Sequence, residues 1–258
     1  MRILAGTSGY AYKEWKGSFY PSDIKPDAML RFYAERFSTV EINNTFYKMP
    51  TERVLLAWLG QVPTGFKFVL KASQRITHRK RLRDASEEVA YFLRIASVLG
   101  DRLGPTLFQL PPNLKKDISR LKDFLTLIPR GWRSAFEFRH DSWFDEETYD
   151  VLRSRNAAMC IADNDEDVSS TASNEPAAAG ANRDHIVSTG NWGYLRLRRA
   201  SYDDASLSGW YYRISTQPWS DAFVFFKHED EGTGPRLAAR FMELSARPPE
   251  VLSRAPNG

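Results

Sequence analysis

Polar side chains recur at every second residue in three short apolar segments of this 258-residue chain. The pairs are Glu41 with Asn43, Glu137 with Arg139, and Arg196 with Arg198. Residues two apart share one face of a strand, so each pair points to one side and its apolar neighbours to the other. Carboxylates can act as general bases, and the planar fork of arginine suits phosphate or carboxylate groups. The pattern predicts an anion-binding site that contains acid–base groups.

Further polar residues lie where other strand-like segments end. Gln109 precedes two prolines, which cannot continue a strand, so it should lie close to the strand end. The other residues in this position are Lys71, Arg75, His78, His140, Asp163, Lys227 and His228. Together with the three pairs they form a mixed set of carboxylates, arginines, lysines and imidazoles.

Aromatic residues gather after the first two strand-like segments. Tyr10 and Trp15 belong to a group of five aromatics within eleven residues, and Tyr47 follows the second segment. Rings beside a basic site can stack on bases or sugars. They can equally close the end of a hydrophobic core, and both interpretations stay open here.

Strand-like and helix-like segments alternate along the chain. Strands are expected at 3–7, 39–43, 66–70, 105–110, 133–138, 157–162, 192–197 and 222–226, and helices at 28–37, 52–59, 86–99, 118–128, 146–153, 207–214 and 236–244. Such alternation predicts a parallel sheet, and eight units in about 250 residues fit a closed (β/α)₈ TIM-like barrel. Functional residues of such barrels lie at the C-terminal strand ends, here called the mouth. A doubly wound open sheet is the alternative.

The chain is expected to form one domain, because no linker-like segment divides it. We predict a barrel over residues 1–246 and a flexible C-terminal tail over 247–258. Residues 164–190, rich in Ser, Ala, Asn and Asp, should form a long loop after the sixth strand. Cys160 is the single cysteine, so an intrachain disulfide is excluded, and its apolar neighbours predict a buried thiol.

The net charge of +4 hides a local excess of positive charge. Six Lys and Arg residues and no acid lie between Lys71 and Arg83. Such a stretch suggests an anionic partner such as nucleic acid, with a solvated loop as the alternative. The N-terminus lacks the apolar stretch of a signal peptide, and no apolar run reaches the roughly 20 residues that span a membrane. We therefore expect a cytoplasmic protein without a membrane partner.

Metal and cofactor sites have weak support in the sequence. Glu41, Glu137 and Asp163 with His140 or His228 would offer oxygen and nitrogen ligands to a divalent ion. Neighbouring arginines would repel a cation, and no pair of histidines has metal-binding spacing. Glycine-rich nucleotide-binding loops and the serine-nucleophile motif are also missing from the sequence. We expect neither a metal nor an organic cofactor.

Several strings of the sequence resemble the YecE-like family, a widespread domain of unknown function. They are Gly6-Thr7-Ser8-Gly9-Tyr10, Val40-Glu41-Ile42-Asn43, Leu107-Phe108-Gln109-Leu110-Pro111-Pro112 and Glu137-Phe138-Arg139-His140. The resemblance extends over nearly the whole chain and implies a TIM-like barrel, but it implies no activity. The last two strands depart from the commoner pattern, with Arg196-Leu197-Arg198-Arg199 and Lys227-His228, and these departures add positive charge to the mouth.

We expect the mouth to bind a phosphate-bearing ligand, in an enzyme acting on nucleic acid or a nucleotide-like substrate. Two alternatives stay open: an isomerase or lyase acting on a small phosphorylated sugar or carboxylate, and a non-enzymatic nucleic-acid-binding protein. The candidate catalytic residues are Glu41, Glu137, Asp163 and Lys71, with Glu41 or Glu137 as the general base. The candidate binding residues are Tyr10, Trp15, Asn43, Tyr47, Arg75, His78, Gln109, Arg139, His140, Arg196, Arg198, Lys227 and His228.

Overall fold

Eight parallel strands form the centre of the computed structural model, which describes residues 1–163 and 186–246. They are β1 (Arg2–Thr7), β2 (Thr39–Ile42), β3 (Lys67–Lys71), β4 (Leu103–Gln109), β5 (Ser134–Glu137), β6 (Ala158–Asp163), β7 (Trp192–Leu197) and β8 (Asp221–Phe226). The sheet order is β1-β8-β7-β6-β5-β4-β3-β2. Its two end strands meet through one parallel bridge between Ser8 and Glu41, so the sheet forms a nearly closed barrel. The predicted TIM-like barrel is confirmed, and the open-sheet alternative is wrong.

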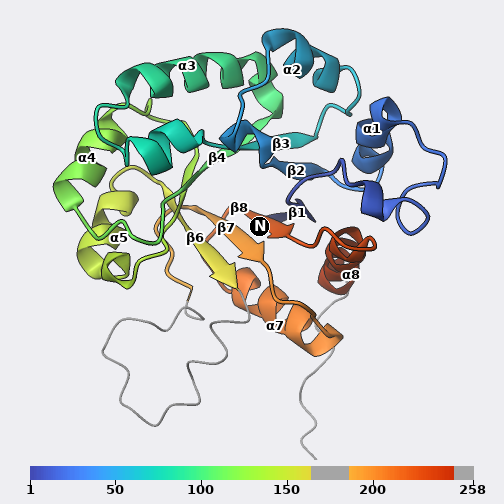
Figure 1. Cartoon of the computed structure of the whole chain (residues 1–258). Coiled ribbons are helices and arrows are strands. Elements are labelled where there is room, and N and C mark those ends of the chain that lie inside the picture. Colours follow the sequence, from blue (N-terminus) through green and yellow to red (C-terminus); the bar gives the residue numbers. More distant parts are fainter. Residues whose placement is uncertain (164–185, 247–258) are drawn as a thin grey trace, which may run out of the picture.

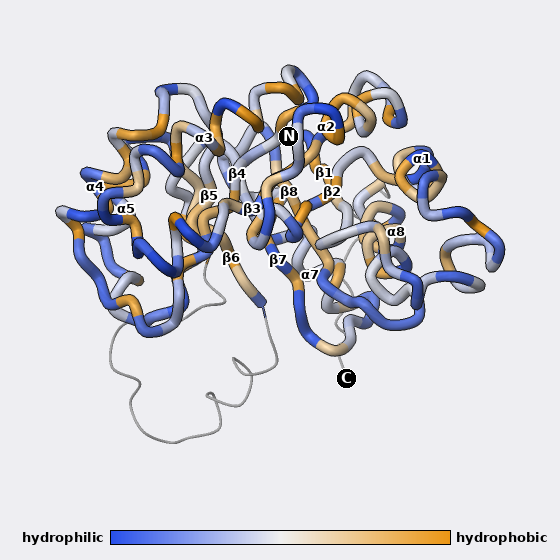
Figure 2. The backbone as a smooth tube through the Cα atoms, turned by 45° about the horizontal axis from the view of Figure 1, so that its top comes forward, coloured by the Kyte–Doolittle hydropathy of each residue, from blue (hydrophilic) through white to orange (hydrophobic). Residues whose placement is uncertain are grey.

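Helices form a ring around these strands (Figure 1). They are α1 (Met29–Ala34), α2 (Glu52–Leu59), α3 (Ser86–Ala96), α4 (Ile118–Thr126), α5 (Glu146–Arg153), α7 (Asp204–Ser215) and α8 (Thr233–Ala246). Hydrophobic and hydrophilic positions alternate along most of them, as a helix with one buried face requires (Figure 2). In α4, for example, Leu121, Phe124 and Leu125 are buried.

The strands begin and end within two residues of their predicted positions. Two predicted helices extend three residues too far: α1 ends at Ala34 and not at residue 37, and α3 ends at Ala96 and not at residue 99. After α3, a 3₁₀ segment, Ser97–Arg102, contains Gly100 with a φ of 49°, which interrupts the helix. Residues 186–190 of the predicted loop have no helix or strand. The rest of that loop, 164–185, and the predicted tail, 247–258, lie outside the described residues. None of the described helices is long and apolar enough to cross a membrane.

The strands carry two hydrophobic layers, as their alternating residues predict. One layer fills the barrel and includes Val69, Leu107, Cys160 and Phe225. The other lies between strands and helices and includes Val40 of β2. Cys160 is 4% exposed, so the predicted buried thiol is confirmed, and burial raises its pKa well above the ordinary value.

A tyrosine hydroxyl from α1 fills the seam between β1 and β2. The backbone N–H of Thr7 donates to the Tyr33 hydroxyl at 2.9 Å, and this hydroxyl in turn donates to the backbone oxygen of Thr39 at 3.1 Å. A Cβ atom at Gly6 would lie 2.2 Å from the same Thr39 oxygen, so the close approach requires glycine. The hydroxyl therefore replaces a direct strand-to-strand hydrogen bond.

Replacing Tyr33 by Phe should destabilise the protein by roughly 1–3 kcal/mol, because a buried N–H and a buried carbonyl would lose their partner. Urea denaturation measures this as a loss in the free energy of unfolding. The matched variant Tyr212→Phe removes a hydroxyl from a side chain that is 68% exposed and should leave stability unchanged. Equal stability of Tyr33→Phe and the wild type would show that the hydroxyl does not hold the seam.

Candidate functional site

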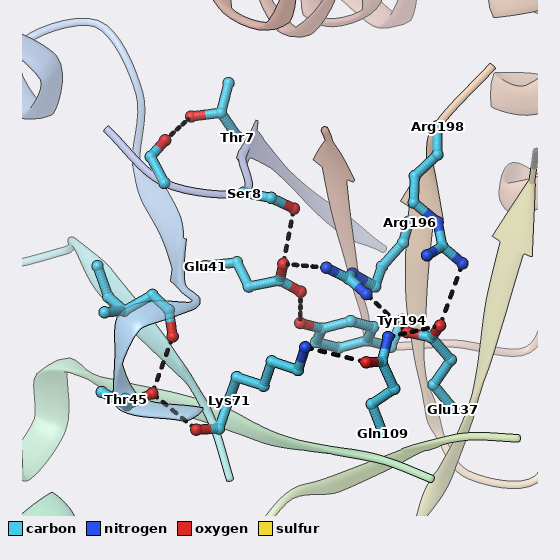
Figure 3. Close-up of polar contacts among 12 residues, drawn as sticks. Thr7, Ser8, Glu41, Thr45, Lys71, Gln109, Glu137, Tyr194, Arg196 and Arg198 are labelled. Carbon is cyan, nitrogen blue, oxygen red and sulfur yellow. Dashed lines mark hydrogen bonds and ion pairs between the residues drawn. The ribbon is translucent and has the colours of Figure 1, made fainter. Parts of the chain in front are cut away.

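One buried arginine lies between two buried carboxylates inside the mouth of the barrel (Figure 3). Arg196 of β7 donates from Nη2 to Oε1 of Glu41 at 2.9 Å and from Nη1 to Oε2 of Glu137 at 2.7 Å. All three side chains are at most 2% exposed. The two-residue period of β2, β5 and β7 directs them inward, as predicted. The structure thus brings together three of the predicted site residues in one charge cluster.

Glu41 is held by two further hydroxyl groups. Ser8 donates to its Oε1 at 2.6 Å, and Tyr194 donates to its Oε2 at 2.5 Å. Burial opposes ionisation, but Arg196 and the two hydroxyls outweigh it and lower the pKa of Glu41. Neither hydroxyl residue was predicted as part of the site. Tyr194 precedes Arg196 by two residues in β7, so the same strand period would have identified it.

Both carboxylate oxygens of Glu137 also accept hydrogen bonds from neighbouring side chains. Its Oε1 accepts from Nε2 of Gln109 at 2.8 Å and from Nη2 of Arg198 at 3.1 Å, and Nε of Arg139 lies 4.0 Å away. Burial opposes ionisation, but Arg196 and Arg198 outweigh it and hold the pKa of Glu137 at about 2. A carboxylate with so low a pKa is a weak proton acceptor near neutral pH. The contacts and the low pKa of Glu137 therefore suit an anchoring role for this carboxylate, and the general-base role of Glu41 or Glu137 stays a prediction.

Lys71 ends β3 at the edge of this cluster. Its Nζ donates to Oε1 of Gln109 at 3.0 Å and lies 4.3 Å from the centre of the Phe46 ring. Burial, followed by the charge of Arg196, lowers the pKa of Lys71 to about 8, against the opposing effect of the two glutamates. Both protonation states of this amine are therefore populated near neutral pH. Gln109 joins Lys71 to Glu137, in the position predicted for it at the end of β4.

Other predicted binding residues lie around the mouth with fewer contacts. Asn43 and Tyr10 line a small cavity of about 180 Å³, and Oδ1 of Asn43 is buried without a hydrogen-bond partner among the described residues. Nδ1 of His78 lies 2.9 Å from the Thr77 hydroxyl, and burial lowers the pKa of this histidine. Tyr47 is 73% exposed. The remaining exposed residues of the predicted set are Arg75, Arg139 and Lys227.

The structure does not bring Asp163 to the two glutamates. Its side chain lies on the outer face of β6, because Cys160, an odd number of residues away, faces the barrel interior. The Asp163 carboxylate accepts hydrogen bonds from Arg199 at 2.6 Å, Tyr202 at 2.9 Å and Trp210 at 3.1 Å. Burial raises its pKa despite these contacts. Asp163 thus connects β6 to α7 and the segment before it.

Three more predicted binding residues have contacts within the fold. Trp15 is fully buried in an aromatic cluster, which agrees with the core-closing interpretation for that residue. Nδ1 of His140 accepts from the backbone N–H of Ser142 at 3.2 Å. His228 is 8% exposed, and its Nε2 contacts the backbone oxygen of Arg199. Over residues 1–163 and 186–246, no three His, Cys, Asp or Glu side chains are grouped so that they could hold a metal ion.

The basic stretch between Lys71 and Arg83 is partly neutralised by acids of neighbouring elements. Lys80 forms an ion pair with Glu88 at 2.9 Å, and Arg83 lies 3.7 Å from Asp117. Lys71 belongs to the mouth. The three remaining basic residues are exposed and are Arg75, Arg79 and Arg81. The stretch is therefore less cationic than its sequence suggests.

Glu137 should make the folded state sensitive to acid. Its pKa of about 2 lies below the usual 4.5, so the unfolded chain binds its proton more tightly. The resulting stabilisation is fully present above about pH 4.5 and is lost as the pH falls toward about 2. Urea denaturation across this range should show that Glu137→Gln loses less stability than the wild type. Glu14→Gln, at an exposed site, should keep the wild-type slope, and an equal slope for Glu137→Gln would contradict the assignment.

Comparison with known proteins agrees with the resemblance seen in the sequence. The family described as "Protein of unknown function DUF72" matches residues 4–258. UPF0759 protein YecE of Escherichia coli K12 is 34% identical over 116 residues, which cover 45% of this chain and 43% of YecE. The matched part thus spans less than half of that relative. UPF0759 protein YunF of Bacillus subtilis 168 is 24% identical, with 94% of each chain covered.

Solved structures of DUF72 proteins have the same fold. A DUF72 protein of Thermotoga maritima MSB8 superimposes with a TM-score of 0.78 at 26% identity, covering 95% of this chain and 99% of the other. One from Enterococcus faecalis V583 gives a TM-score of 0.74 at 15% identity, with 95% and 96% covered, and shows the likeness of fold alone. With the family match over nearly the full length, this chain belongs to the DUF72 family, whose function is unknown.

Proposed function

We propose that the mouth binds a small phosphate-bearing molecule and that Lys71 exchanges a proton with it. The observation that carries the proposal is the Lys71 amine. It has a pKa of about 8, it bonds to a neutral amide, and it lies beside a set of arginines. An amine of this kind is suited to acid–base catalysis near neutral pH.

The charge balance of the mouth supports an anionic ligand. Arg196 forms an ion pair with both Glu41 and Glu137, and Arg198 donates one more hydrogen bond to Glu137. The negative charges of the two glutamates are therefore compensated within the protein. Lys71 and the half-exposed Arg139 add positive charge at the opening of the cluster. A phosphate group can accept hydrogen bonds from such cations, with arginine able to offer two at once. A bound phosphate would also favour the charged form of Lys71.

An isomerase or lyase reaction fits these groups better than hydrolysis with a glutamate base. A neutral Lys71 amine can accept a proton from a hydroxyl or from a carbon beside a carbonyl, and the resulting ammonium can return it. Arginine N–H groups at the mouth would stabilise the negative charge that develops on the substrate oxygen. A small phosphorylated sugar or hydroxy acid has all the groups that this chemistry needs.

A nucleic-acid substrate is the second candidate, favoured by the three exposed arginines after β3. Arg75, Arg79 and Arg81 extend the positive surface beyond Lys71. Arg81 donates to the side chain of Asn113 at 3.2 Å, which leaves its charge without a counterion in that contact. A strand of nucleic acid would use these residues for successive phosphates, whereas a small ligand would not reach them.

Removing either cation at the opening should weaken ligand binding. We expect Lys71→Met and Arg139→Gln each to raise the Kd for ribose 5-phosphate or AMP about tenfold, as loss of one charged contact of about 1.4 kcal/mol requires. Isothermal titration calorimetry measures this, with Lys115→Gln, at an exposed site elsewhere, as the matched control. Unchanged affinity in both mouth variants would rule out the proposed ligand position.

The same titrations separate the two candidates when a twelve-residue oligothymidylate is added as a third probe. If nucleic acid is the ligand, it will bind more tightly than AMP, and its affinity will fall steeply with salt. The triple variant Arg75→Ser, Arg79→Ser, Arg81→Ser would then reduce the slope of log K against log salt by about 2. Retention of ribose 5-phosphate binding in this variant, without oligonucleotide binding in the wild type, supports the small-molecule proposal.

Lys71 should react with acylating reagents at lower pH than other lysines. With a pKa of about 8, about half of the Lys71 amines are neutral at pH 8, whereas an ordinary lysine has a pKa of about 10.4. Trace labelling with acetic anhydride, read by mass spectrometry over a pH series, gives the midpoint for each site. Exposed lysines in the same spectra serve as the reference, and a Lys71 midpoint near theirs would contradict its acid–base role.

A further inference from the structure

A second cavity opens at the N-terminal end of the barrel, opposite the mouth. Its volume is about 360 Å³, within the range of small-molecule sites. Three charged residues line it, as far as the described chain forms it, and all three are cations: Arg2, Lys67 and Arg133. They come from the beginnings of β1 and β3 and from the residue before β5. The barrel closure therefore assembles this cluster from distant parts of the sequence.

One buried acid behind the cavity fixes two of the cations. Oδ1 of Asp221 accepts from Nε of Arg2 at 3.0 Å, and its Oδ2 lies 2.7 Å from Nη2 of Arg133. Burial opposes ionisation of Asp221, but the two arginines outweigh it and lower its pKa. Arg133 also lies over the Trp192 ring, at 5.7 Å from its centre. Each guanidinium is thus positioned by one N–H contact and keeps further N–H groups for a ligand.

Lys67 is the third cation of the cavity. Its ammonium donates to the backbone oxygen of Asp101. Burial and the charges of Arg2 and Arg133 lower its pKa, while Asp101 and Asp221 act in the opposite direction. The ammonium therefore lies in a field that disfavours its charge, and an anion within the cavity would relieve this repulsion.

We propose that this cavity is a second ligand site, which binds a small polyanion such as pyrophosphate or a phosphate ester. The three cations that line the cavity carry more positive charge than the single carboxylate of Asp221 can compensate. Because Asp221 already orders two of them, binding would require little rearrangement. The proposal depends on residues of the N-terminal end alone, so it is independent of the function proposed for the mouth.

Calorimetric titration of the full chain with inorganic pyrophosphate at low salt tests the site. We expect Lys67→Gln and Arg133→Gln each to weaken binding at this site at least tenfold. Arg130→Gln removes an exposed arginine that does not line the cavity and should keep the wild-type affinity. Should Arg133→Gln fail to fold, Arg2→Gln takes its place, because the Arg2 side chain is 58% exposed.

The double variant Lys71→Met, Arg139→Gln separates the two ends of the barrel. If it binds pyrophosphate and loses that binding when Lys67→Gln is added, the N-terminal site is supported whatever happens at the mouth. The proposal is overturned if the wild type does not bind pyrophosphate. It is equally overturned if binding is lost only in the mouth variants, or if folded Lys67→Gln and Arg2→Gln proteins bind as the wild type does.

Discussion

The ion pairs of Arg196 with Glu41 and with Glu137 are the interaction on which the mouth of this barrel depends. They connect β7 to β2 and β5 across the barrel, above an interior filled by apolar residues such as Val69, Leu107 and Phe225. Without this arginine, Glu41 would lose its ion pair and Glu137 would keep only Arg198 close to it, and an unpaired buried carboxylate costs several kcal/mol in a protein interior. The inward charged side chains of β2, β5 and β7 therefore depend on one another, because each would be a buried charge without its ion-pair partner.

This arrangement also decides which group is left for chemistry. The two glutamate carboxylates accept hydrogen bonds from Arg196, Arg198, Gln109, Ser8 and Tyr194. Gln109 donates to Glu137 and accepts from Lys71, so its amide connects the carboxylate–arginine cluster to the Lys71 amine at its edge. The low pKa values of the carboxylates follow from this network, whereas the pKa of Lys71 is lowered first by burial and then by the charge of Arg196.

Strand polarity is the part of the site that can be predicted from sequence. Glu41, Glu137 and Arg196 each lie between two apolar residues at the end of β2, β5 or β7, and this local alternation identifies them as inward side chains. In β6, both faces are lined by small or apolar residues, and so the outward direction of Asp163 carried no signal. Which carboxylate meets which arginine depends on the stagger of strands around the barrel, and local sequence does not encode it.

The fold was predictable for similar reasons. The features that could not be predicted depend on tertiary contacts between distant parts of the chain. Strand positions follow from short β-branched and aromatic segments bounded by turns. The role of Tyr33 could not be predicted, because nothing near it in sequence distinguishes it from Phe32 or Phe37. The cations of the N-terminal cavity likewise resemble ordinary surface residues until the barrel closes.

The seam that Tyr33 fills has a consequence for how the barrel opens. β1 is aligned with β8 over six residue pairs but touches β2 through one bridge, so backbone contacts around the ring are unequal. The weakest joint coincides with the covalent beginning of the barrel and lies directly beside Ser8 and Glu41. Thermal fluctuations would therefore separate β1 from β2 before they separate other neighbouring strands. Such a split would admit water to one end of the buried charge row while the other seven joints stayed closed.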